Sequence, residues 1–313
     1  MARRLPEMRR LAQRRSTLVL AAALAVWLVA ASSVRAATGF EPNPSKATPA
    51  KPSGKRSRGR GFGASAGIST KDEQRRQQRL GKDPAMTEAR KALLSQTLEQ
   101  RFPMGQVDVD LVLPAYVMDL SRFAREVESG VGTVSDIVWP AEQVLAQTLL
   151  QRKDLWQARG LCEIGAGLGL AGIAAAKAGA PRVLLNDRDH LVLELATRSA
   201  ERNNVAQLVS TSAFDWADQK AWPKPFGGLT AGADVLYDKE VVRPLVDLIV
   251  HFGGSALLVE PDNVERRQLG SVPYFKDVLS SQGLALTMES YLNPAQPSSP
   301  MLIISVNKVI EVA

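Results

Sequence analysis

Residues 162–172 have the sequence CEIGAGLGLAG, and this stretch decides the fold. Its first residues are typical of a buried strand, its glycines of a tight turn, and its last residues of the start of an alanine-rich helix. Glycines let the backbone approach a ligand closely, and the first N–H groups of the helix point into the same space. We therefore expect the loop between strand and helix to bind a nucleotide.

A second apolar run, Val183–Asp187, ends in an acid. An acid at the end of the second strand of such a sheet can accept hydrogen bonds from both ribose hydroxyls. The two stretches together predict a nucleoside pocket. Residues 167–172 also fit the dinucleotide pattern G-x-G-x-x-G, so a dehydrogenase is one alternative, and a glycine turn that merely connects two elements is another.

The net charge of +7 is unevenly distributed over the 313 residues. Residues 1–85 contain 18 Lys plus Arg and 5 Asp plus Glu, a net charge of +13, whereas residues 86–313 contain 21 and 27, a net charge of −6. The basic character therefore belongs to an amino-terminal leader. Because the remainder has no excess of positive charge, we expect no nucleic-acid partner for the folded domain.

Cysteine and histidine usage is sparse. Cys162 is the single cysteine, which excludes an intrachain disulfide, and we expect it to be a small buried apolar residue. His190 and His251 are far apart, and no Cys/His spacing typical of a zinc site occurs, so we expect no metal.

The leader begins like a signal peptide. Residues 1–17 contain six arginines and one acid, and Leu18–Ala31 is an apolar run of fourteen residues. Fourteen helical residues span only ~21 Å, which is too short for a permanent transmembrane helix. We therefore predict a signal or targeting peptide over residues 1–36 that contacts a membrane only transiently. Arg14-Arg15 also permits a twin-arginine signal.

Residues 37–85 are rich in Ser, Pro, Gly, Lys and Arg, a composition that predicts a disordered basic linker or transit segment. A signal peptide followed by such a segment resembles the bipartite leaders that direct proteins to plastids of secondary origin. Alternatives are plain secretion with a basic linker, a mitochondrial presequence or a membrane anchor. The expected location is thus an organelle or the secretory pathway.

The folded part divides into a lead-in, residues 86–137, and a main domain, residues 138–313. In the lead-in we expect a helix from about 86 to 102 and a hairpin through 107–118. In the main domain a helix should begin at Pro140, whose missing N–H suits the first turn. Beyond the glycine loop we expect helices at 191–203 and 241–252, and strands near 208 and at 233–237, 256–260, 284–292 and 301–309.

This alternation predicts an α/β fold, a Rossmann-like doubly wound sheet of seven strands. The loop between the last two strands is too short for a crossover helix, so they should form a terminal antiparallel pair.

Four stretches carry a resemblance to a known family. They are Val138-Trp139-Pro140, Glu163–Gly172 with the pattern E-x-G-x-G, Phe214-Asp215-Trp216 and Asp234-Val235-Leu236-Tyr237. With them the chain resembles the class I (seven-β-strand) S-adenosylmethionine-dependent methyltransferases, and among these the protein-lysine methyltransferase group, which is similar to nicotinamide N-methyltransferase. The D-x-x-Y element discriminates best, because dinucleotide dehydrogenases have no reason to carry it. The sequence EPDN at residues 260–263 departs from the usual pattern on the substrate side.

The resemblance implies S-adenosylmethionine as cofactor and assigns residues to it. Gly165 and Gly167 would pass under its methionine part, and Asp187 would bind its ribose. Glu163 would order the glycine loop or contact the methionine amine.

Aromatic residues would complete the cofactor pocket. The resemblance implies that Asp215 and Trp216 frame the adenine. Trp139 would close the pocket as an aromatic wall, and its ring face could favour the sulfonium cation. Alternatively, both tryptophans are core residues.

Asp234 and Tyr237 are the candidate catalytic residues, because we expect them at the carboxyl end of the fourth strand, where open α/β sheets place their chemistry. Asp234 could hold the incoming ammonium, and Tyr237 could orient the neutral amine. Alternatively, Asp234 caps the following helix and Tyr237 packs under it.

The function that this implies is methyl transfer to a lysine side chain of a protein substrate. Such a transfer is an in-line displacement that requires proximity and a deprotonated nucleophile. Alternatives are a small-molecule N-methyltransferase and a non-catalytic protein that binds S-adenosylmethionine.

Overall fold

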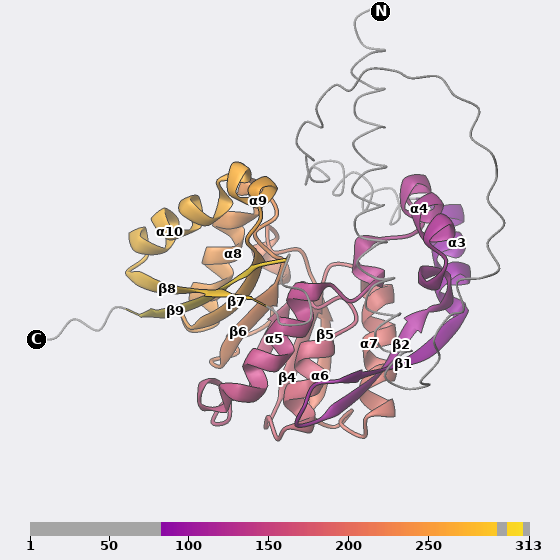
Figure 1. Ribbon diagram of the computed structural model, residues 1–313, viewed down its shortest axis with the longest axis horizontal. Helices are drawn as coiled ribbons and strands as arrows, with labels where there is room; N and C mark the ends of the chain where they lie inside the picture. The colour runs from indigo at the N-terminus through magenta and orange to yellow at the C-terminus, as the bar shows by residue number, and fades with distance from the viewer. Residues whose placement is uncertain (1–82, 293–298, 309–313) are drawn as a thin grey trace, which may run out of the picture.

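The computed structural model describes residues 83–292 and 299–308 (Figure 1). The predicted targeting peptide, residues 1–36, and nearly all of the predicted linker, residues 37–85, lie outside the described residues. Within the described part, no helix combines the length and the apolar character needed to cross a bilayer.

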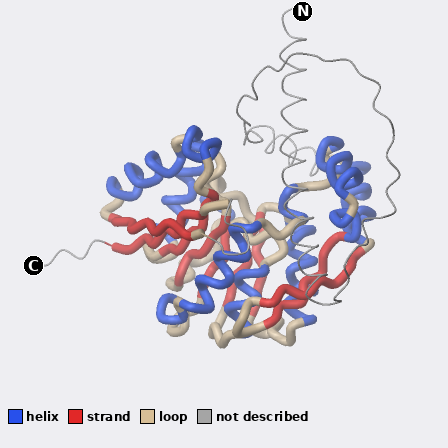
Figure 2. Tube along the Cα trace, in the orientation of Figure 1, coloured by secondary structure: helices blue, strands red, loops and turns tan. Residues whose placement is uncertain are grey.

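The main domain contains a seven-stranded sheet with the order β5-β4-β3-β6-β7-β9-β8. Figure 2 shows the strands in red and the helices in blue. Five strands are parallel, and β9 runs antiparallel to both of its neighbours, β7 and β8. The predicted doubly wound sheet and its terminal antiparallel pair are confirmed. The strands are β3 Leu161–Ile164, β4 Val183–Asp187, β5 Val209–Ala213, β6 Leu229–Ala233, β7 Ala256–Pro261, β8 Leu284–Tyr291 and β9 Met301–Lys308.

Strand order reverses at β3, which has β4 on one side and β6 on the other. Leu161 pairs with Val183 in β4 and with Leu229 in β6. All four residues of β3 are buried, as expected for a central parallel strand covered on both faces. The crevice at the carboxyl end of β3 is therefore the switch point where such sheets bind ligands.

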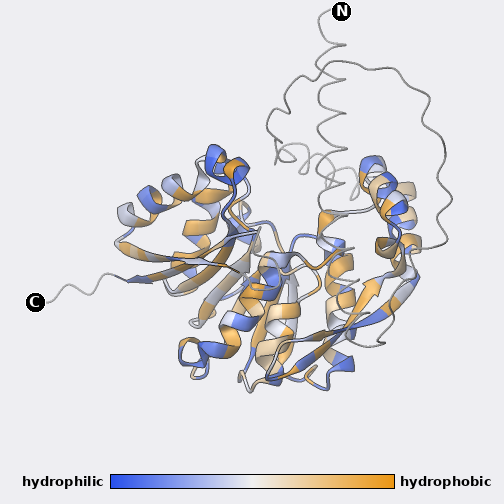
Figure 3. Ribbon diagram, in the orientation of Figure 1, coloured by the Kyte–Doolittle hydropathy of each residue, from blue (hydrophilic) through white to orange (hydrophobic). Residues whose placement is uncertain are grey.

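Helices cover both faces of the sheet, and each face has its own apolar core. Figure 3 shows the hydrophobic stretches of these helices and strands in orange. One core contains residues of α5, α6 and α7, and the other contains residues of α8 and α10. The main-domain helices are α5 Pro140–Gln151, α6 Leu170–Lys177, α7 His190–Arg202, α8 Lys239–His251, α9 Val264–Leu269 and α10 Ser271–Ser281, with short 3₁₀ helices at Lys153–Leu155 and Gln219–Ala221. The predicted helices at Pro140, 191–203 and 241–252 are confirmed, whereas α9 and α10 had no counterpart in the sequence prediction.

The lead-in differs from the prediction. The predicted helix over 86–102 is correct only in its first part, because α3 spans Pro84–Ser95 and Thr97–Pro103 is strand β1. Strand β1 pairs antiparallel with β2, Asp108–Pro114, in a separate two-stranded sheet. Residues 115–118, assigned to the hairpin from sequence, form a 3₁₀ helix that precedes α4, Leu120–Ser129, and a further 3₁₀ helix, Val134–Asp136.

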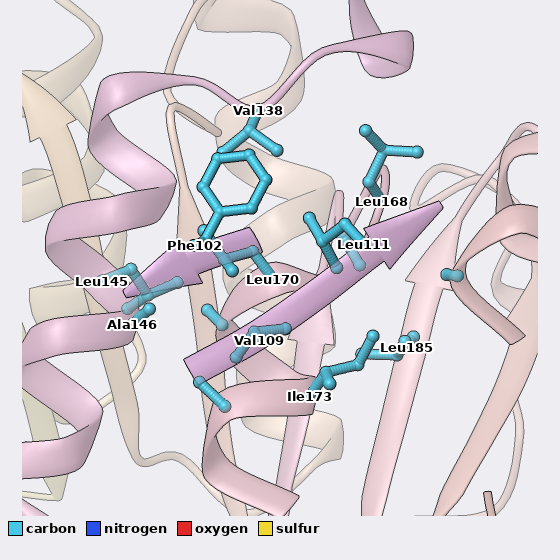
Figure 4. Close-up of a cluster of buried hydrophobic side chains, with 14 of the residues drawn as sticks. Phe102, Val109, Leu111, Val138, Leu145, Ala146, Leu168, Leu170, Ile173 and Leu185 are labelled. Atoms are coloured by element: carbon cyan, nitrogen blue, oxygen red, sulfur yellow. The ribbon is translucent and has the colours of Figure 1, made fainter. Parts of the chain in front are cut away.

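Hydrogen bonds to α7 and the burial of apolar side chains hold the β1–β2 hairpin in its place. Strand β2 lies against α7, where the Val112 amide donates to Oγ of Ser199 at 2.9 Å and the Asp110 amide donates to Oδ1 of Asn203 at 3.0 Å. Side chains of both hairpin strands join the core formed by α5, α6 and β4 (Figure 4). Those labelled there are Phe102, Val109, Leu111, Val138, Leu145, Ala146, Leu168, Leu170, Ile173 and Leu185.

The strand predicted at 233–237 is displaced. Strand β6 ends at Ala233, so residues 234–237 lie in the loop that follows it. Asp234 has a φ of 55°, a left-handed conformation that cannot continue a strand. The D-x-x-Y element therefore lies at the carboxyl edge of the sheet, on the same edge as the glycine loop.

Candidate active site

The glycine loop connects β3 to α6 in a conformation that requires glycine. Gly167 has a φ of 51°, and a Cβ at this position would lie 3.1 Å from the Ser135 carbonyl oxygen. The segment before α5 therefore packs directly against the loop. A Cβ on Gly165 would lie 3.4 Å from the Trp216 ring and 3.3 Å from Val235, so this glycine lies beside both the predicted adenine side and the D-x-x-Y element.

Two buried acids hold the helix that follows the loop. The Gly172 amide donates to Oε2 of Glu163 at 2.6 Å, and the Leu170 amide donates to Oε1 of Glu142 at 2.8 Å. Burial raises the pKa of both carboxyls, and the charge of Glu163 raises that of Glu142 further. The contact of Glu163 with Gly172 in the first turn of α6 is compatible with the first of its two expected roles, the ordering of the glycine loop, and both roles stay predictions. Glu142 was not predicted, although a carboxyl among the apolar residues at the start of α5 was a visible signal.

Asp187 links the end of β4 to the glycine loop. Its Oδ2 accepts from the Gly167 amide at 3.1 Å, and its Oδ1 accepts from the Asp189 amide at 2.9 Å. Burial raises the pKa of this carboxyl to about 6, against the effect of the two backbone donors. A carboxylate has about four acceptor positions, so two remain for ribose hydroxyls, and Asp187 fits its predicted role.

Trp216 is held beside the glycine loop by a side chain that sequence reasoning missed. Its Nε1 donates to Oδ1 of Asn186 at 2.8 Å, and Nδ2 of Asn186 donates to the carbonyl oxygens of Ser212 and Phe214 at 3.0 and 3.1 Å. The half-buried ring is therefore fixed next to Gly165 and fits an adenine wall.

Asp215 and Trp139 have local partners. Oδ1 of Asp215 accepts from the Ala217 amide at 2.9 Å. Trp139 precedes α5 and donates from Nε1 to the Val134 carbonyl oxygen at 2.9 Å, and its half-buried ring packs against the first core. The Trp139 ring thus packs against the core, as the alternative interpretation expected. Its contact with a cofactor stays a prediction.

On the acceptor side, Asp234 has a cationic partner within the chain. A guanidinium nitrogen of Arg266, in α9, donates to Oδ1 of Asp234. Burial raises the pKa of Asp234, whereas the Arg266 charge and hydrogen bond lower it. The cap of α8 is Asp238, whose Oδ1 accepts from the Glu240 amide at 2.9 Å, so the alternative that Asp234 caps this helix is wrong.

Tyr237 is half-buried, three residues after Asp234 and just before α8. Its position on the loop after β6 agrees with the prediction, and its role in transfer stays a prediction. Arg266 was missed because α9 was not predicted, and its partner lies 32 residues earlier in the chain.

The lead-in is attached to the cofactor side by a buried ionic cluster. Arg90, in α3, donates to both carboxylate oxygens of Asp136, at 2.5 and 2.6 Å, and to Oδ2 of Asp189 at 2.8 Å. The Tyr116 hydroxyl and the Thr133 amide also donate to Asp136. Asp189 in turn caps α7 and binds Asp187 through its amide, so the cluster ends at the predicted ribose acid.

Among the described residues, no three His, Cys, Asp or Glu side chains are grouped as metal ligands would be. Cys162 is buried in β3, as expected.

These features together define a class of protein. A sheet of this order, a glycine loop after β3, an acid ending β4, an aromatic residue after β5 and a D-x-x-Y element after β6 are the arrangement of a class I S-adenosylmethionine-dependent methyltransferase. Residues 122–271 match the family model described as "Lysine methyltransferase". Over these residues, slightly less than half of the chain, the protein is similar to the lysine methyltransferase family, and its cofactor is S-adenosylmethionine.

Several curated proteins are similar to parts of the chain. The protein N-lysine methyltransferase METTL21A of Danio rerio is 31% identical over 130 residues, which are 40% of this chain and 59% of that protein. The histone-arginine methyltransferase METTL23 of Rattus norvegicus is 35% identical over 107 residues, 33% of this chain and 47% of that protein. The human electron transfer flavoprotein beta subunit lysine methyltransferase is 35% identical over 111 residues, 35% and 40% of the two chains. The matched part thus spans about half the length of these relatives.

Among solved structures, the O-methyltransferase TomG from Streptomyces achromogenes, in complex with S-adenosylmethionine, superposes with a TM-score of 0.41 and 16% identity. The superposition covers 60% of this chain and 88% of that one.

Proposed function

We propose that the protein transfers a methyl group from S-adenosylmethionine to a lysine side chain of another protein. The observation that carries the proposal is the position of Asp234, a carboxylate with a cationic partner that lies on the edge of the sheet where the glycine loop also lies. The matched lysine methyltransferase family and the relatives described above support the same acceptor.

Residues at the carboxyl edge would hold the cofactor. Asp187 would accept hydrogen bonds from the ribose hydroxyls, and Trp216 would stack on the adenine beside Gly165. Trp139 would close the pocket. Bound in this way, S-adenosylmethionine supplies an electrophilic methyl group on a sulfonium.

The transfer requires one neutral amine nitrogen in line with the methyl carbon. The lysine ammonium would have to lose a proton to solvent before its nitrogen lone pair could accept the methyl group that bound S-adenosylmethionine would supply. Asp234 would attract the ammonium into the site, and the low polarity of the buried surroundings would favour the neutral amine. Tyr237 would orient that amine.

A second acceptor, an arginine side chain, is supported by one specific contact. The Asp234 carboxylate binds the guanidinium of Arg266, so the space beside it already accommodates a guanidinium. The relative METTL23 is described as a histone-arginine methyltransferase. An arginine acceptor would be methylated at this same carboxylate.

The leader supports a proposal about location. Its arginine-rich start, apolar run and basic segment favour delivery to an organelle or to the secretory pathway, with a plastid of secondary origin as the favoured compartment. A fluorescent protein fused behind residue 85 would test this. Diffuse fluorescence throughout the cytosol would contradict it.

The proposed activity is tested by incubating the full chain with tritiated S-adenosylmethionine and a soluble cell extract, and then separating proteins from small molecules. Label on a discrete protein band, absent with Asp234→Ala, supports protein methylation, and amino-acid analysis of the band distinguishes methyl-lysine from methyl-arginine. Label only in the small-molecule fraction would favour a metabolite N-methyltransferase. Cofactor binding without any transfer would leave a non-catalytic binding protein.

A further inference from the structure

Glu260 contacts the D-x-x-Y element from the neighbouring strand. It is the penultimate residue of β7 and is only 2% exposed. Its Oε1 accepts from the Val235 amide at 2.9 Å and from the Leu236 amide at 3.1 Å. These two amides belong to the residues between Asp234 and Tyr237. One carboxylate oxygen therefore holds the two central residues of the turn formed by residues 234–237, where we propose that the methyl acceptor binds.

The turn needs such a support, because its first residue is strained. Asp234 adopts a φ of 55°, in the left-handed region that residues with a side chain seldom populate. Its amide donates to the Val259 carbonyl oxygen at 2.9 Å, one residue before Glu260. The amides of residues 234–236 thus donate three hydrogen bonds to two adjacent residues of β7, and these bonds fix the conformation that directs the Asp234 side chain.

The charges around Glu260 bring it into the same group as Asp234. Burial and the negative charge of Asp234 raise the pKa of Glu260, whereas the Arg266 guanidinium lowers it. Arg266 lies on α9, which begins four residues after Glu260. Two acids and one guanidinium therefore meet between the ends of β6 and β7.

We propose that Glu260 is a positioning residue for methyl transfer, which acts by accepting the Val235 and Leu236 amides and so holds Asp234 and Tyr237 toward the acceptor. The proposal rests on the function proposed above. It assigns to Glu260 no contact with the acceptor or the cofactor. Both amides donate to one oxygen of Glu260, and burial together with the charge of Asp234 raises the pKa of this side chain and so disfavours its ionised form. The position of that oxygen should therefore matter more than the charge of the side chain.

Two conservative variants separate reach from charge. Glu260→Gln keeps an oxygen at the same distance and loses the charge, whereas Glu260→Asp keeps the charge and withdraws the oxygen by one methylene. Asp262→Asn is the matched control, because Asp262 lies two residues further on and pairs with Arg267 through an exposed contact at 2.6 Å.

Three quantities are measured on the full chain. They are amide hydrogen exchange over residues 234–238, binding of S-adenosylhomocysteine by calorimetry, and the rate of tritium transfer from saturating S-adenosylmethionine to the proteins of a soluble extract. For Glu260→Asp we expect faster exchange and a rate lowered at least about tenfold, because misplacing a reacting group by about 1 Å costs up to ~100-fold. Its dissociation constant for S-adenosylhomocysteine should stay within about twofold of wild type. Glu260→Gln should keep slow exchange and a rate within about threefold of wild type.

Three results would overturn the proposal: an unchanged rate in Glu260→Asp, a loss in Glu260→Gln as large as in Glu260→Asp, or a similar loss in Asp262→Asn. Weakened cofactor binding in Glu260→Asp would also overturn the proposal, because the substitution would then disturb the cofactor pocket and not only the position of Asp234 and Tyr237. If the proposed function itself is wrong, the result differs from all of these, because the wild-type chain would then label no protein. The exchange rates over residues 234–238 would still decide whether Glu260 holds the turn.

Discussion

A guanidinium nitrogen of Arg90 lies 2.8 Å from Oδ2 of Asp189, although the two residues are 99 positions apart in the sequence. Both side chains are almost fully buried. Asp189 donates its amide to Asp187, so the contact joins helix α3 of the lead-in to the predicted ribose acid. The lead-in is therefore part of the structure that forms the cofactor side.

Arg90→Met should destabilise the protein by about 3–5 kcal/mol, because it leaves the Asp136 and Asp189 carboxylates buried without a cation. Methionine roughly preserves the volume of the side chain, so the loss reports charge more than packing. Urea unfolding measures the change. Arg101→Met, which removes an exposed ion pair with Asp110, is the matched control and should leave the midpoint almost unchanged. Equal effects of the two substitutions would contradict a role for the buried cluster.

The stability of the protein should fall as pH rises between about 5 and 8, in part because of Glu163. Burial raises the pKa of this carboxyl to about 8 in the folded state, well above the value in an unfolded chain. Between the two values the folded state binds more protons than the unfolded state, so raising the pH favours unfolding.

Glu163→Gln should flatten this dependence, because an amide does not titrate in the range and its oxygen can still accept from the Gly172 amide. Unfolding free energies measured in urea at pH 5, 6.5 and 8 test the prediction. Glu194→Gln, at an exposed position of α7, should preserve the wild-type slope. A slope in Glu163→Gln as steep as in wild type would show that Glu163 does not titrate as described.

Local sequence predicted β3, β4 and β7 well, because each is a short buried apolar run and glycines mark the turn after β3. It placed β6 too late, and β5, with the sequence VSTSA, is no apolar run. It failed at β1. Thr97–Pro103 contains Leu, Glu, Gln and Arg, which favour helix in isolation, and only pairing with β2 and burial of Phe102 make it a strand. A window of local sequence does not contain that partner.

Some residues of the candidate site were predicted from local sequence, and others were missed. Glu163, Gly167 and Asp187 belong to local patterns, and the structure brings them together within hydrogen-bonding reach of one loop. Glu142, Glu260 and Arg266 were missed, because the partner of each lies 24 to 32 residues away and the local sequence does not identify that partner. Long-range polar contacts depend on which strands are neighbours in the sheet. The sequence predicted the class of fold, but it did not predict which side chains from neighbouring strands would meet.

Cofactor affinity should depend on pH through Asp187. Burial raises the pKa of its carboxyl to about 6. The ionised form accepts hydrogen bonds from ribose hydroxyls at more positions than the protonated form, so binding should tighten as pH rises from 5 to 7. Calorimetric titration with S-adenosylhomocysteine over this range measures the effect. Asp187→Ala should weaken binding by ~1–3 kcal/mol and remove most of the dependence on pH. Unchanged affinity in Asp187→Ala would contradict the ribose assignment.

Asp234 should be required for transfer and not for cofactor binding. Asp234→Ala removes the carboxylate that would attract the acceptor's charged amine, and we expect no detectable transfer of tritium while the dissociation constant for S-adenosylhomocysteine stays within a few fold. Alanine at a φ of 55° adds backbone strain, so Asp234→Asn is the cleaner variant, since asparagine tolerates the left-handed region. It changes the charge and keeps the turn. A rate in Asp234→Asn reduced by at least about 100-fold, with normal cofactor binding, would show that the charge acts on the acceptor. If both variants instead lose cofactor binding, Asp234 belongs to the cofactor site, and the acceptor must bind elsewhere along the carboxyl edge.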